Sequence, residues 1–379
     1  MRITIAERLR PFSHLPGTTF MLPGTTLSVT IFPVFIRLSD ISGLFPEIIA
    51  EINLGLEGPV LDFTAIQDLE NSRLRVFGNS LAGYFLYTIH PLREKKGILI
   101  SAEKLPNQIT ILCAGKLKAN KDAFNQGESI TISEDVKGES AAEVAINNDG
   151  SIERLSLGSH KKQDWELVRR RLLLSEIFPV WFRLGQMSPQ LDFNVYEGIP
   201  FLLQDCEGAI AGNAPEKILS SFKNLFLIGF DGILSPRSID TEHHGIKYPN
   251  IDFSKCEKTK SSPLCLLTEG ARLIRSLFLQ EKRDGIHVLP ALPPEFHCGR
   301  MLDLKCGNGG KLSLEWTKKS LRSMTFTASV DQTINFKFSN HEKKCRLRSS
   351  NKDKGMVYIP GTELTVIKGQ DYWFDNFQR

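Results

Sequence analysis

The stretch "DGIHVLPALPPEF", from Asp284 to Phe296, stands where the chain changes its character. Its three prolines fix the backbone and remove N–H donors, which favours an extended path. The residues before it follow the period of a helix, and those after it alternate as in a strand. We therefore expect a joint between two domains at about Gly285. Val288, Leu289 and Leu292 should pack this crossing against a helical core.

The region before the joint predicts three helices. Residues 164–185 show apolar side chains at helical spacing, with Asp164 as the N-terminal cap and Pro179 as a kink. A second helix, residues 215–229, begins at a proline, which suits a first helical turn. A third begins at Ser262 and should end at the Asp-Gly pair of the quoted stretch, because glycine permits a left-handed stop.

The two ends of the chain predict β-structure. The first part consists of short β-branched runs separated by Pro, Gly, Asn and Ser, which is typical of a large β-sandwich. Within it, the near-repeat "LPGTTFMLPGTT" (15–26) predicts two Pro-Gly turns. After the joint, the Gly-rich turn "CGNGG" (306–310) and the alternating run after it predict a small antiparallel β-sandwich. The fold class is therefore α+β and multidomain, with boundaries at 1–158, 159–285 and 286–379.

Composition excludes several classes of protein. The net charge of +4 over 379 residues is too small for a dedicated nucleic-acid-binding protein. No apolar run approaches the roughly 20 residues of a membrane span, and the N-terminus lacks the apolar core of a secretory signal. Seven cysteines occur without a CxxC pair, so zinc and redox motifs are unsupported. We expect a cytoplasmic protein with no cofactor and no metal, and the sequence leaves a homo-oligomer open.

The quoted stretch and its surroundings resemble a known family. Residues 264–324 resemble the segment that leaves the catalytic barrel in inverting α-L-fucosidase-type glycoside hydrolases. The shared features are a helix before an Asp-Gly turn, a Leu-Pro-Ala-Leu-Pro core, and a Gly-rich hairpin into a strand that ends in tryptophan. In this chain they are Asp284, Gly285, Leu289, Pro290, Ala291, Leu292, Pro293, Gly299, Gly309, Gly310 and Trp316. These residues are structural, so the motif indicates descent and carries no chemistry.

The resemblance implies a β-supersandwich, an (α/α)6 barrel and a C-terminal β domain. The first and last parts agree with the β regions at the two ends of the chain. The middle is too short, because helices of about 11–12 residues with connections of about 4–6 need on the order of 190 residues for a full barrel. Residues 161–285 hold only about half of such a set. The expectation is therefore a supersandwich-like domain, an incomplete α/α barrel and a small β domain.

Inverting hydrolysis needs one group that protonates the leaving oxygen and another that activates water, roughly 6.5–9.5 Å apart. The resemblance implies an Asn pair and an Asp on the base side, and a distant Glu as the acid. The run "LDFNVYEGIPFLLQD" (191–205) matches the first Asn with Asn194, but Tyr196 stands in the second position. The run "YPNIDF" (248–253) matches the Asp with Asp252. No segment matches the one that carries the Glu.

A polar cluster in "GFDGILSPRSIDTEHHGIKYPNIDF" (229–253) adds candidates that do not depend on the resemblance. Asp240 and Glu242 could supply an acid–base pair, and Arg237 and His243 could bind a sugar. A metal at His243 is disfavoured, because adjacent histidines rarely share one ion on a regular element. The alternative is a solvated connection whose polar residues face water.

Aromatic residues offer a further mark of sugar sites. Trp181 and Tyr196 could stack on a pyranose face, although aromatic residues on helix faces more commonly belong to the core. Cys206 lies between two carboxylates, which disfavour a thiolate, so it is a poor nucleophile. The chain also lacks GxSxG and GxxxxGK[ST] motifs.

Two hypotheses follow. The first is a carbohydrate-active or glycan-binding protein related to glycoside hydrolases, with reduced or lost hydrolase activity and a glycan or small sugar as its partner. The second is a non-catalytic structural or interaction protein that retains only the glycosidase scaffold. The preserved motif does not separate them, because it consists of packing residues.

Overall fold

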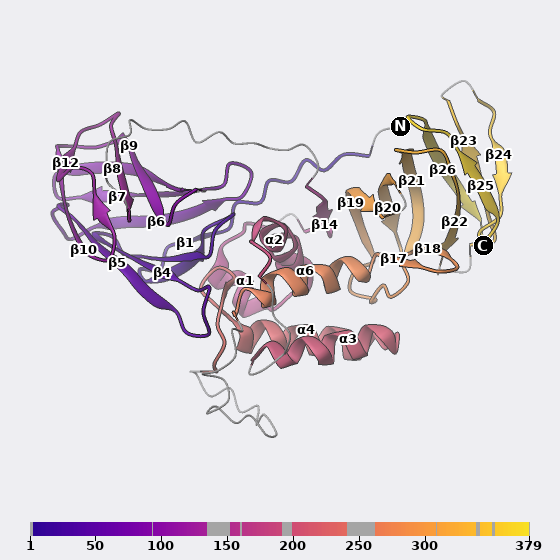
Figure 1. Cartoon of the computed structure of the whole chain (residues 1–379), viewed down its shortest axis with the longest axis horizontal. Coiled ribbons are helices and arrows are strands. Elements are labelled where there is room, and N and C mark those ends of the chain that lie inside the picture. The colour runs from indigo at the N-terminus through magenta and orange to yellow at the C-terminus, as the bar shows by residue number, and fades with distance from the viewer. Residues whose placement is uncertain are drawn as a thin grey trace.

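The computed structural model describes residues 3–92, 94–134, 152–159, 161–191, 199–240, 262–307, 309–338, 342–350 and 353–378. Figure 1 shows a β-sandwich at one end, helices in the middle and a second β region at the other end. The predicted fold class, with a large N-terminal β-sandwich, a short helical middle and a C-terminal β domain, is confirmed.

The N-terminal β-sandwich consists of two sheets around an apolar core. In spatial order, the first sheet contains β1 (Phe12–Ser13), β6 (Leu61–Asp68), β7 (Arg73–Ser80), β8 (Gly83–Pro91), β9 (Gly97–Lys104), β13 (Ser129–Ser133) and β11 (Lys118–Ala119). The second contains β12 (Ala123–Phe124), β10 (Ile109–Gly115), β5 (Glu47–Leu54), β4 (Phe35–Asp40), β3 (Leu27–Ile31) and β2 (Thr18–Met21). Burial alternates along the strands, as in β7, where Leu74 and Val76 are buried between half-exposed neighbours.

The predicted Pro-Gly turns flank β2. Gly17 and Gly24 have φ values of +84° and +80°, which is the left-handed conformation that a type II turn requires at its third residue. β2 runs between them and pairs with β3 in antiparallel register. The near-repeat therefore brackets one edge strand of the sandwich.

The first predicted helix is two helices in the structure. α1 (Trp165–Arg171) begins at Asp164, whose Oδ1 accepts hydrogen bonds from the backbone N–H groups of Glu166 (3.2 Å) and Leu167 (3.4 Å), so the predicted cap is confirmed. The helix is interrupted at Leu172, which has a left-handed φ of 49°. α2 (Leu174–Met187) follows and contains Pro179. The interruption thus lies before the proline, where Leu172 caps α1 through its own N–H.

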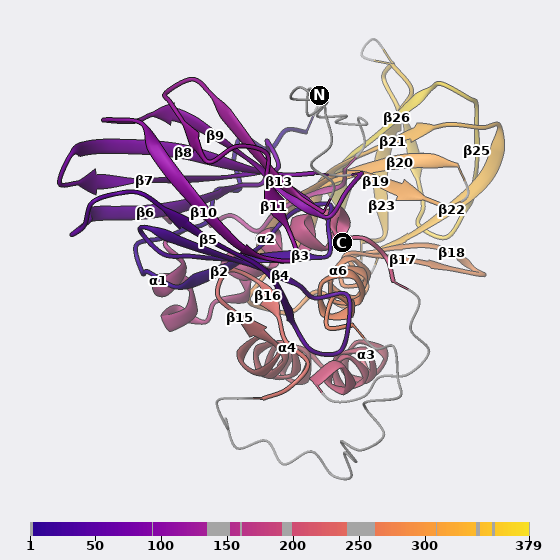
Figure 2. The same ribbon diagram turned by 60° about the vertical axis from the view of Figure 1, so that its left-hand side comes forward.

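The other helices form a compact group with α2. They are the short 3-10 helix η1 (Ile199–Phe201), α3 (Leu202–Ala211), α4 (Pro215–Gly229) and α6 (Cys265–Ser276). α4 begins at Pro215 and confirms the second predicted helix. α2 and α6 lie next to the two β regions, and α3 and α4 lie on their outer side (Figure 1 and Figure 2).

Two glycines allow α2 and α6 to approach closely. A Cβ at Gly185 would collide with the Leu267 carbonyl oxygen and lie 2.6 Å from the Ala271 Cβ. A Cβ at Gly270 would lie 2.5 Å from the indole ring of Trp181. The close crossing buries Trp181, whose Nε1–H donates to the Leu266 carbonyl oxygen (3.0 Å).

Helix α6 is anchored where the sequence predicts but ends earlier. The Ser262 hydroxyl accepts from the Leu264 N–H (3.2 Å) and donates to the Ile41 carbonyl oxygen (2.8 Å), so it also fastens the helix start to the sandwich. The helix ends at Ser276, and β17 (Leu279–Lys282) pairs with β18 (Gly285–Val288) across a two-residue turn at Arg283 and Asp284. The predicted helix stop at Gly285 was therefore wrong, because Gly285 is the first residue of β18 and pairs with Lys282.

The C-terminal β domain contains two sheets. The larger contains β14 (Arg154–Ser156), β19 (Cys298–Cys306), β20 (Gly310–Thr317), β21 (Ser320–Ala328), β26 (Asp371–Gln378), β23 (Lys344–Arg348) and β24 (Met356–Tyr358). The smaller contains β17, β18, β22 (Gln332–Phe338) and β25 (Glu363–Val366), with β18 parallel to β22. The predicted β19–β20 hairpin is confirmed. A short pair of strands, β15 (Phe230–Asp231) and β16 (Ser235–Pro236), follows α4 and contacts β2.

The stretch "LPALPPEF" joins the helices to the C-terminal domain. Val288 and Leu289 are buried and Leu292 is partly buried against the core, as predicted. Phe296 is fully buried, with its ring 5.3 Å from that of Phe178 in α2. Its carbonyl oxygen accepts a hydrogen bond from Trp316 Nε1 (2.9 Å) in β20. The prolines carry the chain across this joint, and Phe296 fills the space between the two parts.

Glu153 forms hydrogen bonds with α2, α6 and β19. Its carboxylate, only 7% exposed, accepts two hydrogen bonds from Arg275 Nε in α6 (3.0 and 3.1 Å) and one from the Lys305 N–H in β19 (2.8 Å). Its backbone N–H and carbonyl bond the side-chain amide of Gln186 in α2 (3.0 and 3.1 Å). β14 begins at the next residue, so Glu153 sets where that strand enters the C-terminal sheet.

The close crossing of α2 and α6 can be tested with two glycine substitutions. Gly185→Ala should lower the free energy of unfolding by about 2–3 kcal/mol, because the added methyl meets backbone that cannot move aside. Gly208→Ala on the exposed face of α3 meets no atom within 4 Å and should raise stability by about 0.5–1 kcal/mol. Urea unfolding of both variants measures the difference, and equal effects would contradict the close approach.

Removal of the Glu153 carboxylate should destabilise the protein strongly. Glu153→Ala leaves the Arg275 Nε–H and the Lys305 N–H without their acceptor, which should cost about 3 kcal/mol. Glu47→Ala is the matched control, because Glu47 pairs with Lys116 on the surface and its loss should cost at most about 1 kcal/mol. Urea unfolding compares the variants, and a Glu153→Ala protein as stable as the control would refute the linking role.

Candidate functional site

Five of the predicted site residues lie outside the residues that the structure describes. They are Asn194, Tyr196, Glu242, His243 and Asp252. The structure does describe the other three, which are Trp181, Arg237 and Asp240. These three residues do not line a common cavity among the described pockets.

Trp181 belongs to the core. Its side chain is fully buried, and its ring lies 4.5 Å from that of Phe230 and about 6 Å from those of Phe178 and Phe222. These aromatic contacts are edge-on, the geometry that packed rings prefer. The indole faces protein on all sides, so the core alternative describes Trp181 and the sugar-stacking alternative has no exposed ring face to use.

Arg237 is engaged at the end of α4. Its Nε–H donates to the Ile228 carbonyl oxygen (2.8 Å) and its Nη2 to that of Leu227 (3.2 Å). A cation that satisfies the last carbonyls of a helix is a common C-terminal cap. Asp240 is half-buried and also has interactions within the protein. Arg237 therefore has a structural role at the end of α4.

An open groove lies beside the N-terminal segment, and we call it the basic groove. Its volume is about 510 Å³. It is lined by Ile5, Ala6, Glu7, Arg8, Arg10, Ser156, Ser159, Lys161, Gln163 and Arg300. These residues come from the N-terminal segment, β14, the loop before α1 and β19. Small-molecule sites usually have about 300–1,000 Å³, so the groove has the size of a ligand site.

Side chains from several parts of the chain hold the N-terminal segment along this groove. The Gln163 amide accepts from the Arg10 N–H (2.6 Å) and donates to the Arg8 carbonyl oxygen (3.2 Å). Arg154 donates to the Glu7 carbonyl oxygen (3.1 Å), and Arg300 to that of Thr4 (3.0 Å). Figure 1 shows the segment crossing from the C-terminal domain to the sandwich. The groove therefore lies where both β domains and α1 meet.

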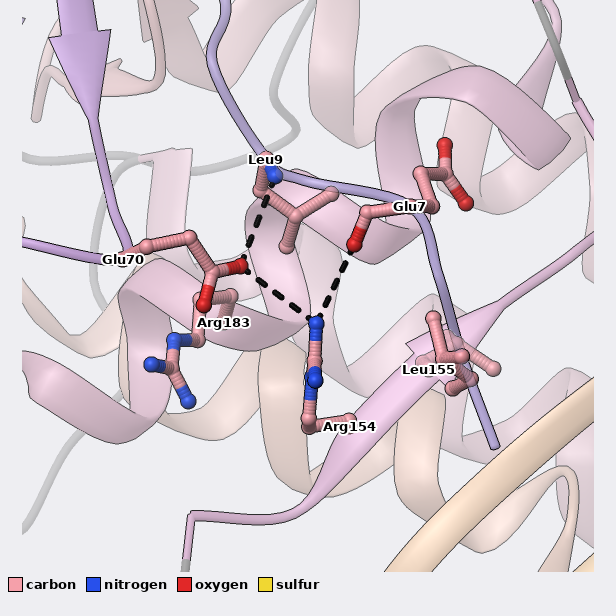
Figure 3. A pocket seen from close by; sticks show the side chains of 7 residues that line it. Glu7, Leu9, Glu70, Arg154, Leu155 and Arg183 are labelled. Carbon is pink, nitrogen blue, oxygen red and sulfur yellow. Dashed lines mark hydrogen bonds and ion pairs between the residues drawn. The ribbon is translucent and has the colours of Figure 1, made fainter. Parts of the chain in front are cut away.

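A smaller cavity lies under the same segment and contains a buried charge (Figure 3). Arg183 of α2 is 8% exposed, and among the described residues it forms no hydrogen bond or ion pair. Burial lowers the pKa of Arg183, and the nearby Glu70 opposes this effect. Glu70 itself accepts from Arg154 (3.5 Å) and from the Leu9 N–H (3.5 Å). The cavity has about 10 Å³, which is room for one water between these groups.

The carboxylates that line these cavities are all engaged. Glu7 accepts from the Ser156 hydroxyl (2.8 Å), Glu70 from Arg154, and Glu176 from Arg171 (2.7 Å). General acid–base catalysis needs groups that can reach the substrate and exchange protons with it. No such pair of unengaged carboxylates lines these three cavities among the residues that the structure describes.

The described residues give no support for a cysteine nucleophile, a metal site or a membrane-spanning helix. Burial, assisted by Asp205, raises the pKa of the Cys206 thiol, so the prediction of a poor nucleophile is confirmed. The residues that the structure places contain no group of His, Cys, Asp and Glu side chains suited to a metal. None of the helices it places is long and apolar enough to cross a membrane.

Sequence reasoning missed the basic groove. Arg8 and Arg300 lie far apart in the chain, and no local motif marks either residue. The cationic pair in "ERLRP" (7–11) was the only visible signal, and such pairs usually face solvent. The groove forms only because β14 carries the middle of the chain back beside β19.

Comparison with known proteins gives one match. The sequence model described as "Glycoside hydrolase family 95, C-terminal domain" matches residues 280–373. These residues run from the second residue of β17 to the third residue of β26 and include Arg300 of the basic groove. No curated protein matches the chain. The match therefore shows a likeness to a glycoside hydrolase domain in the C-terminal β domain of the chain.

The C-terminal β domain of this chain is thus similar to the domain that ends the glycoside hydrolases of family 95. The Leu-Pro-Ala-Leu-Pro core and Trp316, on which the resemblance was based, both lie within the matched residues. The match concerns the C-terminal quarter of the chain and leaves the helical region to be judged on its own structure.

The isolated charge of Arg183 can be tested by replacing it. Arg183→Met should leave the free energy of unfolding unchanged or raise it by about 1 kcal/mol, because it removes a buried cation without an ion pair. Arg154→Met, at a neighbouring position, should lower it by about 1–2 kcal/mol, since Arg154 bonds both Glu70 and Glu7. Thermal and urea unfolding report both values. A loss above about 2 kcal/mol for Arg183→Met would show that the cavity stabilises this guanidinium.

Proposed function

We propose that this protein binds a glycan through the basic groove and has reduced or lost the hydrolase activity of its relatives. The observation that carries the proposal is the position of the groove. It lies against the domain that matches a glycoside hydrolase family, and Arg300 of that domain lines it. Ser156, Ser159 and Gln163 add hydroxyl and amide groups, which are the partners that sugar hydroxyls require.

The loss of hydrolysis is supported by the helical region and by the carboxylates. The five α-helices that the structure describes fall short of a full α/α barrel, and we interpret them as its remnant. The acidic residues lining the described cavities are held by Arg154, Arg171 and Ser156. These acidic residues are therefore not arranged as the pair of free carboxyl groups that inverting hydrolysis needs.

A second function is a scaffold or interaction protein without a sugar ligand. It is favoured by one observation, namely that the residues carrying the family likeness are packing residues. Leu289, Phe296 and Trp316 are buried, and none lines the basic groove. In this case the groove would be a solvated joint. We further propose a cytoplasmic location, and a homo-oligomer remains compatible with both functions.

The two functions differ in one binding experiment. The full chain should bind a subset of glycans on an array, with confirmation by isothermal titration calorimetry. The double variant Ser156→Ala, Ser159→Ala should bind at least about tenfold more weakly, because two hydroxyl groups of the lining are lost. Ser313→Ala, which removes a hydroxyl on β20 outside the groove, is the control and should bind as the parent does. Absence of any glycan binding would favour the scaffold function.

Hydrolysis is tested separately with aryl fucosides, glucosides and galactosides. We expect no turnover by the full chain and none by Asp252→Asn, which replaces the Asp carried over from the resemblance. Turnover by the parent that is lost in Asp252→Asn would show that catalysis survives and depends on Asp252. Release of the aryl group, followed by absorbance, is the measurement.

A further inference from the structure

We propose that the ligand of the basic groove is an acidic oligosaccharide, one whose sugar units carry carboxylate or sulfate groups. This inference rests on the proposed glycan-binding function and names the class of glycan. It follows from the charges that converge on the groove, from how those charges are paired, and from the side chains that are absent from its lining.

Four cationic side chains converge on the groove from three separate segments. Arg8 and Arg10 come from the N-terminal segment, Lys161 from the loop before α1, and Arg300 from β19. Among the described residues, Glu7 supplies the only carboxylate of the lining, and the Ser156 hydroxyl already binds it at 2.8 Å. A ligand in the groove therefore meets an excess of positive charge.

The ion pairs behind the groove do not cancel this excess of positive charge, because each carboxylate is paired with two cationic side chains. Asp68 pairs with Arg10 (3.3 Å) and also with Arg73 (3.9 Å). Glu176 pairs with Lys161 (3.5 Å) and more closely with Arg171 (2.7 Å).

The same sharing occurs at β19. Glu315 pairs with Arg300 (2.9 Å) and with Arg322 (3.6 Å). Arg8 is exposed and has no ion pair among the described residues. Three cations are thus oriented by shared partners and one is free, which leaves a positive potential in a partly enclosed space.

The neutral part of the lining favours a sugar over another polyanion. Ser156, Ser159 and Gln163 can bind hydroxyl groups. None of the ten lining residues is aromatic, whereas single-stranded nucleic acid is usually bound on aromatic side chains that stack with the bases. Guanidinium groups bind carboxylate and sulfate through charge-assisted hydrogen bonds. The lining therefore fits an oligosaccharide that combines hydroxyl groups with fixed negative charges.

The test measures the binding of four probes to the full chain by isothermal titration calorimetry. The probes are an oligogalacturonate, a heparin-derived hexasaccharide, the neutral cellohexaose, and a single-stranded DNA oligonucleotide of matched charge. We expect at least one of the two acidic saccharides to bind at least about tenfold more tightly than cellohexaose and DNA, because the neutral probe forms no charge-assisted bonds. The two acidic probes separate carboxylate from sulfate recognition.

Charge-removing variants locate the site. Arg8→Gln and Arg300→Gln should each weaken binding of the acidic saccharide by about tenfold. Arg8→Gln removes an exposed side chain and should fold as the parent does, so it keeps the test valid if Arg300→Gln disturbs the N-terminal segment. Arg322→Gln is the matched control, because Arg322 pairs with the same Glu315 but lies outside the groove. Its affinity should stay within about twofold of the parent.

The outcomes separate this inference from the proposed function. Binding of neutral glycans in preference to both acidic probes would overturn the inference and leave the glycan-binding function intact. No saccharide binding at all would overturn both. Equal or tighter binding of DNA, or an equal loss in Arg322→Gln, would also overturn the inference, because the effect would then be one of general charge.

Discussion

The buried carboxylate of Glu153 is the interaction on which the arrangement of the three parts depends. It binds Arg275 of α6 and the backbone of β19, while its own backbone binds Gln186 of α2. A buried carboxylate is costly unless its oxygens are fully bonded, so the helices and the C-terminal sheet must both be in place to satisfy it. One residue thereby couples the position of two helices to that of a strand.

The basic groove is a consequence of this constraint. β14 starts at Arg154, next to Glu153, and it places Arg154 and Ser156 beneath the N-terminal segment. That segment is then held by side chains from β14, β19 and the loop before α1. The site we propose is therefore a product of how the domains meet. It lies away from the middle of the helical region, where the glycoside hydrolases that the chain resembles have their catalytic barrel.

The parts that could be predicted from sequence are those governed by local rules. The Asp164 cap, the Pro-Gly turns and the alternating strands follow from short-range chemistry, and the structure confirms them. The end of α6 could not be predicted, because helical spacing continued into residues that pair as β17 with β18. The hairpin with its turn at Arg283 and Asp284 replaces the helix, since it adds ladder hydrogen bonds that a frayed helix end lacks.

By itself the sequence determined the fold class, the order of the three regions and the descent indicated by "LPALPPEF". These features depend on periodicity and on rigid residues close together in the chain. Only the tertiary structure decided that Trp181 is core, that Arg237 caps a helix, and that Arg8 and Arg300 line one groove. The physical reason is that a binding surface requires convergence of distant segments. Burial of Glu153 and the pairing of β14 with β19 bring those segments together.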